Sequence, residues 1–367
     1  MKSIIQNKLL ESLSFDSHGI LELSPRIGKT KLAIEILKKK DFNKVLWVTP
    51  NAQLRDKDIP EEFKKWEAES LLKKVEIICY NSLDRIKGNY DKVILDEVQF
   101  ITPRNTQNLL SKKLNTRSIL GLTGTLPKSP EKVNILDMLR LRSIAKINIT
   151  EAVNKDLIAD YSIKVIYVPL EGVEKTFKAG TKEKPFLTTE LRNYEYLTSL
   201  INDFKDRGLS IPKHLALRRM KFIYNLDSKL KVAKKLFHSL ESRTLLFAPS
   251  IKAAESISNN TFHSLTNKKD LEGFLEGKIK KLACVNAGGV GFTFKGVQNF
   301  IISQVNSNST GLTTQKIARA LVKQDNYRAN IFIIVAKGTV DEEWLNKSLK
   351  DFDPNKIKYY NAKDFVI

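Results

Sequence analysis

Cysteine and histidine are scarce in this chain, whose 367 residues include two cysteines and four histidines. Cys79 and Cys284 lie far apart, each inside an apolar run, which excludes a disulfide framework and a zinc site and favours reduced residues in a cytosolic core. The histidines lack the spacing of metal ligands. Long apolar runs are also missing, and the N-terminal stretch lacks the features of a signal peptide. We therefore expect a cytoplasmic protein that is neither exported nor membrane-spanning.

Acidic residues are in deficit, with 41 Asp and Glu against 62 Lys and Arg, so the net charge is +21. Charge of that sign attracts polyanions and favours nucleic acid as the partner, although general solubility also accounts for surface charge. Hydrophobic residues make up 42% and charged residues 28% of the chain, a composition typical of folded proteins. The length fits two domains of roughly 150 to 200 residues each.

Short apolar runs alternate with amphipathic stretches, which predicts an α/β fold of parallel sheets flanked by helices. Strands are predicted at residues 19–23, 44–50, 75–80, 92–97, 118–124, 164–170, 244–250, 281–287, 299–305 and 330–336. The rhythm breaks at 148–163, so we predict one lobe over 1–150 and a second over 151–367 with a polar, helical insertion at about 171–240. The basic stretch 213–225 inside that insertion could track phosphates or form a solvated helix face.

The segment LSPRIGKT, residues 23–30, follows a predicted strand and begins a predicted helix. Backbone N–H groups at such a junction bind phosphates, and Lys29 and Thr30 can reach the terminal phosphates and Mg²⁺. The general pattern has glycine five residues before Gly28, where this chain has Leu23. A turn before a helix remains the alternative for this segment taken alone.

A second signal comes from YDKVILDEVQF, residues 90–100, in which a buried strand ends in two adjacent carboxylates. Buried acids are costly unless a cation lies beside them. Asp96 bound to Mg²⁺ and Glu97 polarising a water molecule would supply the reason for both acids. The two segments together predict a site for ATP and Mg²⁺.

The ordered set SPRIGKT, WVTPNAQL, YNSL, DEVQ, GLTGTLP, LLFAPS, NAGGVGFTF and QKIARALV resembles the motifs of superfamily 2 DNA helicases and translocases. The resemblance is closest to the Swi2/Snf2-like group and to phage DEAD/DEAH-box helicases of the UvsW type. It runs from about residue 6 to about residue 350 and is weakest between 171 and 240. It implies two tandem RecA-like lobes with the nucleotide in the cleft between them.

The same resemblance implies residue roles. Binding of ATP is expected from Gln6, whose amide would read the adenine edge, and from the loop residues Ser24, Pro25, Arg26, Ile27, Gly28, Lys29 and Thr30. Mg²⁺ is expected on Thr30 and Asp96. Nucleic acid is expected at Thr49, Pro50, Asn51, Tyr80, Asn81, Ser250, Asn286 and Gly288. Coupling of hydrolysis to DNA movement is expected from Thr123, Thr125, Gly289 and Gly291.

The last motif, QKIARALV, resembles the pattern Gln-x-x-Gly-Arg-x-x-Arg only at Gln315 and Arg319. In the family, arginines of this motif reach across the cleft and stabilise the transferring phosphate. Arg319 with Gln315 is thus predicted to join Lys29, Asp96 and Glu97 in catalysis. Val322 stands where the second arginine is expected, and the charge of Lys323 is a partial substitute for it.

The resulting hypothesis is an ATP-dependent DNA helicase or branch-migrating translocase in recombination, repair or replication, acting as a monomer on single-stranded or branched DNA. The small size of the chain fits a phage or plasmid-borne enzyme. An RNA helicase is one alternative, against which AGGVG and Gln99 argue. A weakly hydrolysing nucleic-acid clamp or regulatory subunit is another, motivated by Leu23, Ala318 and Val322. Protein partners are not indicated.

Overall fold

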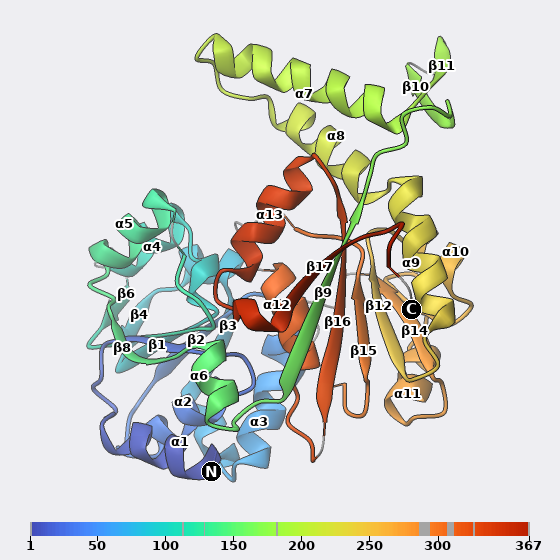
Figure 1. Cartoon of the computed structure of the whole chain (residues 1–367). Coiled ribbons are helices and arrows are strands. Elements are labelled where there is room, and N and C mark those ends of the chain that lie inside the picture. Colours follow the sequence, from blue (N-terminus) through green and yellow to red (C-terminus); the bar gives the residue numbers. More distant parts are fainter. Residues whose placement is uncertain are drawn as a thin grey trace.

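The computed structural model describes residues 2–111, 114–127, 129–180, 183–285, 294–306, 312–325 and 327–365. Two parallel sheets, each flanked by helices, form two lobes (Figure 1). The predicted α/β fold of two RecA-like lobes is therefore confirmed. None of the described helices is long and apolar enough to cross a membrane.

Lobe 1 contains a six-stranded parallel sheet in the order β3-β2-β5-β7-β1-β8. Its strands are β1 (Gly19–Leu23), β2 (Val45–Thr49), β3 (Val75–Cys79), β5 (Lys92–Asp96), β7 (Ile119–Thr123) and β8 (Ser143–Ile147). The α-helices are α1 (Lys2–Glu11), α2 (Lys29–Leu37), α3 (Ile59–Lys65), α4 (Pro103–Leu110), α5 (Pro130–Met138) and α6 (Ile149–Asn154). Shorter elements are η1 (Leu54–Asp58), η2 (Glu69–Lys74), η3 (Tyr80–Arg85), η4 (Val98–Phe100) and the paired strands β4 (Gly88–Tyr90) and β6 (Leu114–Thr116).

Lobe 2 contains a seven-stranded parallel sheet in the order β13-β14-β12-β15-β16-β9-β17. Its strands are β9 (Asp160–Val168), β12 (Thr244–Ala248), β13 (Thr261–Phe262), β14 (Lys281–Val285), β15 (Asn299–Ile302), β16 (Arg328–Ala336) and β17 (Ile357–Asn361). Its helices are α9 (Asp227–Ser239), α10 (Ile251–Ile257), α11 (Lys269–Leu275), α12 (Leu312–Ala320), α13 (Val340–Leu349) and η6 (Pro354–Lys356).

A helical arm, residues 171–226, projects from lobe 2 (Figure 1). It consists of the antiparallel strands β10 (Phe177–Gly180) and β11 (Pro185–Thr188), followed by α7 (Glu190–Asp206) and α8 (Lys213–Tyr224). The next helix, α9, is no longer part of the arm, because its buried face packs in the core beside β12 and β16. The arm therefore leaves the sheet after β9 and returns to it at α9.

The inner strands of both sheets are buried on both faces because helices cover them. In β2, β5, β7 and β12 every residue is buried, which explains why these strands are continuous apolar runs in the sequence. One connected hydrophobic cluster runs through both lobes, by way of α6 and the buried pair Leu157 and Ile158. The carboxyl ends of the strands in lobe 1, where ligands of such sheets bind, carry the residues considered next.

Candidate active site

The segment 24–30 forms a tight loop between β1 and α2. Arg26 and Gly28 both have left-handed backbones, with φ of 71° and 101°. A Cβ atom at Gly28 would lie 2.6 Å from Gln6 Nε2, so glycine is required both by conformation and by space. Gly28 caps the first turn of α2, and unpaired N–H groups at such a helix start favour phosphate.

Gln6 lies against this loop and is buried. Its Nε2 donates to the carbonyl of Ile27 at 2.6 Å, and its Oε1 accepts from Lys31 Nζ at 3.0 Å. The amide of Gln6, on α1, thus binds the phosphate loop through its nitrogen and α2 through its oxygen. Recognition of adenine by Gln6 stays a prediction, and Lys31 is a supporting residue that the motif pattern did not single out.

The acid pair stands at the end of β5, beside the loop. Burial, followed by the charge of Glu97, raises the pKa of Asp96 from 3.8 to about 7, and the charge of Lys29 opposes this shift. Lys29 Nζ donates to the carbonyl of Leu23 at 3.3 Å, which keeps its ammonium group at the loop. The structure therefore places Lys29, Asp96 and Glu97 in one electrostatic cluster.

This cluster fits a magnesium ion. Asp96 is a buried carboxylate whose charged form lacks sufficient compensation from the protein, as its raised pKa shows. Mg²⁺ bound to proteins commonly uses one or two carboxylates, with phosphate oxygens and water as the other ligands. Thr30, in the first turn of α2, carries the hydroxyl that such a site would add.

Hydrogen bonds connect Glu97 to the end of β7. Glu97 has a left-handed backbone with φ of 50°, and its Oε2 accepts from Gln99 Nε2 at 2.7 Å. The Thr123 hydroxyl lies 2.8 Å from Gln99 Oε1 and 2.8 Å from the carbonyl of Thr125. The carboxylate is thereby linked to both threonines that the sequence assigns to coupling.

Lobe 2 contributes an arginine to the same cluster. Burial lowers the pKa of Arg319, while the charges of Glu97 and Asp58 raise it. Burial followed by the charge of Arg319 lowers the pKa of Arg26 to about 10. The guanidinium group of Arg319 is thus attracted by Glu97 and repelled by Arg26 of the phosphate loop, which means that it lies close enough to both groups to sense their charges. Gln315 precedes it by one helical turn on α12 and is partly buried.

Asp58 is a member of this cluster that the sequence did not indicate. It ends η1 and accepts a hydrogen bond from Gln53 Nε2 at 3.0 Å, and its Oδ2 is a buried atom with no hydrogen-bond partner. The sequence gives no sign that Asp58 lies near the site, because the segment RDKD, residues 55–58, has the polar composition of an ordinary solvated helix face.

The position expected to hold a second arginine is occupied differently. Val322 is a buried residue, 8% exposed. Lys323, proposed above as a partial substitute, forms an ion pair with Asp156 next to α6. The Lys323 ammonium group therefore pairs with an acid next to α6 and takes no part in the interactions described for Arg319.

The predicted nucleic-acid residues of lobe 1 differ in exposure. The Thr49 hydroxyl is buried and donates to the carbonyl of Asn51 at 3.0 Å, while the buried Tyr80 hydroxyl donates to the carbonyl of Asp96 at 3.1 Å. Contact of these two side chains with a phosphate is thus not supported by their orientation. Asn81 is exposed, whereas Pro50 and Asn51 are partly buried.

In lobe 2, Ser250 caps α10. The predicted Asn286, Gly288, Gly289 and Gly291 lie outside the described residues.

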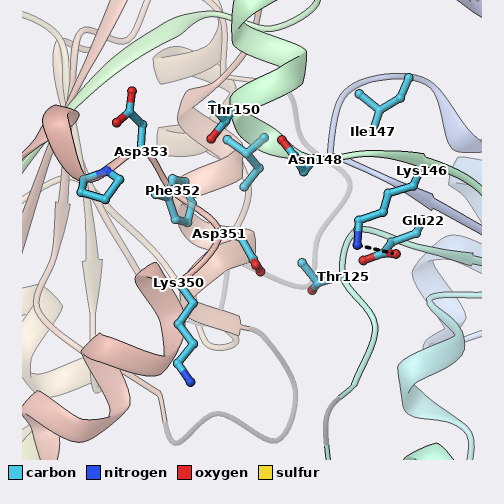
Figure 2. Close-up of a pocket in the computed structure, with 13 residues that line it drawn as sticks. Glu22, Thr125, Lys146, Ile147, Asn148, Thr150, Lys350, Asp351, Phe352 and Asp353 are labelled. Carbon is cyan, nitrogen blue, oxygen red and sulfur yellow. Dashed lines mark ion pairs between the residues drawn. The ribbon is translucent and has the colours of Figure 1, made fainter.

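A cavity of ≈ 410 Å³ lies between the lobes, beside the coupling residues. Lobe 1 lines it with Thr125 and with the ion pair between Lys146 and Glu22, and lobe 2 lines it with residues 350–354 (Figure 2). The hydrogen-bonded connection that begins at Glu97 therefore ends at open space between the lobes.

Comparisons with known proteins agree with this geometry. The sequence matches no protein-family model and no curated protein. The crystal structure of the Pyrococcus furiosus Hef helicase domain matches with a TM-score of 0.57 and 15% identity over 95% of this chain and 97% of that one. The ATP-dependent Type ISP restriction-modification enzyme LlaBIII bound to DNA matches with a TM-score of 0.61 and 12% identity over 97% of this chain, which spans 31% of that enzyme. The chain therefore shares its fold with the Hef helicase domain.

Proposed function

We propose that this protein is a nucleic-acid-dependent ATPase that moves along DNA. The observation that carries the proposal is that Arg319 from lobe 2 is attracted by Glu97 of lobe 1 and lies close enough to Arg26 of the phosphate loop to lower its pKa. A group that reaches a phosphate site from a second lobe makes hydrolysis dependent on lobe closure. ATP would lie against Gln6 and residues 24–30.

The residues of the cleft have separable roles in this proposal. Mg²⁺ on Asp96 and Thr30 would neutralise charge on the terminal phosphates. Glu97 would orient the attacking water, and Lys29 with Arg319 would stabilise charge on the transferring phosphoryl group. Gln315 would complete the site from α12. The hydrogen bonds from Glu97 through Gln99 to Thr123 would report the state of the site to the interlobe cavity.

DNA is the proposed partner because the chain carries a net charge of +21 and because one of its structural neighbours is bound to DNA. Binding through the backbone would be salt-dependent and largely indifferent to sequence. We propose a monomeric, cytoplasmic helicase or branch-migrating translocase of recombination, repair or replication, with single-stranded or branched DNA as the substrate. Within this scheme the domain boundary falls near residue 150.

The direct test is steady-state ATP hydrolysis by the purified protein, alone and with single-stranded DNA, branched DNA or RNA. Strong stimulation by one DNA form, absent in Lys29→Ala, supports the proposal and identifies the substrate class. Stimulation by RNA alone would replace DNA with RNA. Salt-sensitive DNA binding without hydrolysis would favour the clamp, the alternative that the buried Val322 supports.

A further inference from the structure

Helix α8 carries a basic face that the active site does not use. Residues 207–226 include the cations Arg207, Lys213, Arg218, Arg219 and Lys221 and contain no Asp or Glu. His214, Arg218, Lys221 and Asn225 follow one another at spacings of four, three and four residues, which places them on one side of the helix. All four are exposed. We call these four residues the α8 stripe.

The opposite side of α8 is packed. Phe222, Ile223 and Tyr224 are buried, and the ring of Phe222 contacts that of Phe177 at a centroid distance of 4.8 Å. Arg219 turns toward α7, where its Nη1 donates to Thr198 Oγ1 at 3.4 Å. The fold thus separates one arginine that joins two helices from the cations that face solvent.

The α8 stripe ends at Asn225, which contacts Ser250, a residue already predicted to contact nucleic acid. Ser250 Oγ donates to Asn225 Oδ1 at 2.7 Å, so the last position of the stripe touches the cap of α10. The nearest acid that follows in the chain, Asp227, begins α9 beyond the stripe. Arg218 and Lys221 therefore lie on the same side of the helix as Asn225, the residue that touches the expected contact site on lobe 2.

The arm holds this surface in a fixed position. The buried carboxylate of Glu190 accepts from the N–H of Glu171 and from the N–H of Ser228, both at 3.0 Å, and so joins the two chain segments at the root of the arm. The N–H of Val340 donates to the Tyr194 hydroxyl at 3.1 Å, which attaches α7 to α13. A ligand that binds α8 is consequently aligned with lobe 2.

We propose that the α8 stripe binds the phosphate backbone of the DNA segment adjoining the Ser250 contact, and thereby extends the DNA path beyond the two lobes. The proposal rests on the DNA-binding function proposed above. The stripe spans about 16 Å at 1.5 Å per residue, which corresponds to about five base-pair steps at 3.4 Å each. Cations without base-specific partners position the backbone and do not select sequence.

The test compares the double variant Arg218→Ala/Lys221→Ala with the wild type and with Lys234→Ala/Lys235→Ala. The control removes two exposed lysines from α9 in the same lobe, so the net charge changes equally. Equilibrium DNA binding without nucleotide is measured at several salt concentrations, on DNA lengthened in steps of five base pairs. Thermal unfolding verifies that all three proteins are folded.

Affinity falls as salt rises, and the loss of two phosphate contacts should make the slope of log affinity against log salt less negative by about 1.8 in the α8 variant. That variant should also lose the affinity that the wild type gains on DNA longer than the lobes cover, whereas the control should keep it. Wild-type slope and length dependence in the α8 variant would overturn the inference, as would an equal loss in the control. A loss confined to RNA would overturn the choice of DNA.

ATP hydrolysis in the same proteins separates this inference from the proposed function. A lower salt slope in the α8 variant together with no DNA-stimulated hydrolysis in the wild type would uphold the DNA contact and contradict the motor. Stimulated hydrolysis with an unchanged slope would uphold the motor and contradict the contact.

Discussion

Lobes 1 and 2 each contain an all-parallel sheet, but they contribute different groups to the cleft between them. Lobe 1 supplies the phosphate loop, the acid pair and the hydrogen bonds that connect Glu97 to Thr123. Lobe 2 supplies α12, from which Arg319 interacts with the groups of lobe 1. Under the proposed function, nucleotide binding would therefore be a property of lobe 1, whereas turnover would depend on both lobes. The predictions below test that division.

The largest effect is expected from Lys29→Ala. Loss of the ammonium group at the phosphate loop should lower the hydrolysis rate by at least about 10²- to 10³-fold, because no other lysine is placed beside Asp96 by the interactions described. DNA binding should stay near the wild-type level. Lys38→Ala, at the other end of α2, is the matched control, and normal turnover in Lys29→Ala would remove the phosphate-loop assignment.

Arg319→Ala should lower the maximal rate by about 10³-fold while changing nucleotide affinity far less. Pre-steady-state nucleotide binding and steady-state hydrolysis measure the two quantities separately. Lys323→Ala, which breaks an ion pair outside the cluster, serves as the control and should retain its rate. A fall in affinity without a fall in rate would mean that lobe 2 helps to bind nucleotide.

Gln99→Ala should reduce the stimulation of hydrolysis by DNA by about tenfold, since a hydrogen bond to a charged group contributes about 1.5–3 kcal/mol. The expected signature is a smaller ratio of stimulated to basal rate, with the basal rate less affected. Gln107→Ala, an exposed residue on α4, is the control. An unchanged ratio would show that Glu97 and Thr123 are not coupled through this amide.

The smallest effect concerns stability without nucleotide. Because the folded-state pKa of Asp96 is raised from 3.8 to about 7, the folded protein binds an extra proton between these pH values. Its stabilising contribution is complete below pH 3.8 and is lost as pH rises through about 7. Asp96→Asn should therefore gain stability relative to the wild type as pH rises from 5 towards about 7, by about 1.4 kcal/mol per pH unit. Denaturant unfolding at pH 5 and pH 8 measures this, and a difference independent of pH would contradict it.

The strands were largely predictable because buried parallel strands are continuous apolar runs. Each of the ten predicted runs overlaps a strand. The edge strands β8 and β17 were missed, since both are largely exposed and carry polar residues. The hairpin of the arm was missed as well, because its polar sequence resembles an exposed loop.

For the site, the sequence indicated which segments carry the candidate phosphate-binding and acidic groups. It did not indicate the orientation or the hydrogen-bond partners of individual side chains. The inward hydroxyls of Thr49 and Tyr80 depend on hydrogen bonds to backbone atoms that only the fold brings near. The ion pair of Lys323 with Asp156 joins residues 167 positions apart. Such contacts depend on tertiary packing, so periodicity and spacing could not reveal them.

The carboxylate of Glu190 has a mechanical consequence. The carboxylate binds the segment that enters the arm, at Glu171, and the segment that leaves it, at Ser228, so the arm can move with lobe 2 as a lever. Helix α7, with 17 residues, extends about 25 Å from that fulcrum at 1.5 Å per residue. A small rotation of lobe 2 against lobe 1 would thus be amplified into a larger sweep at the tip of the arm.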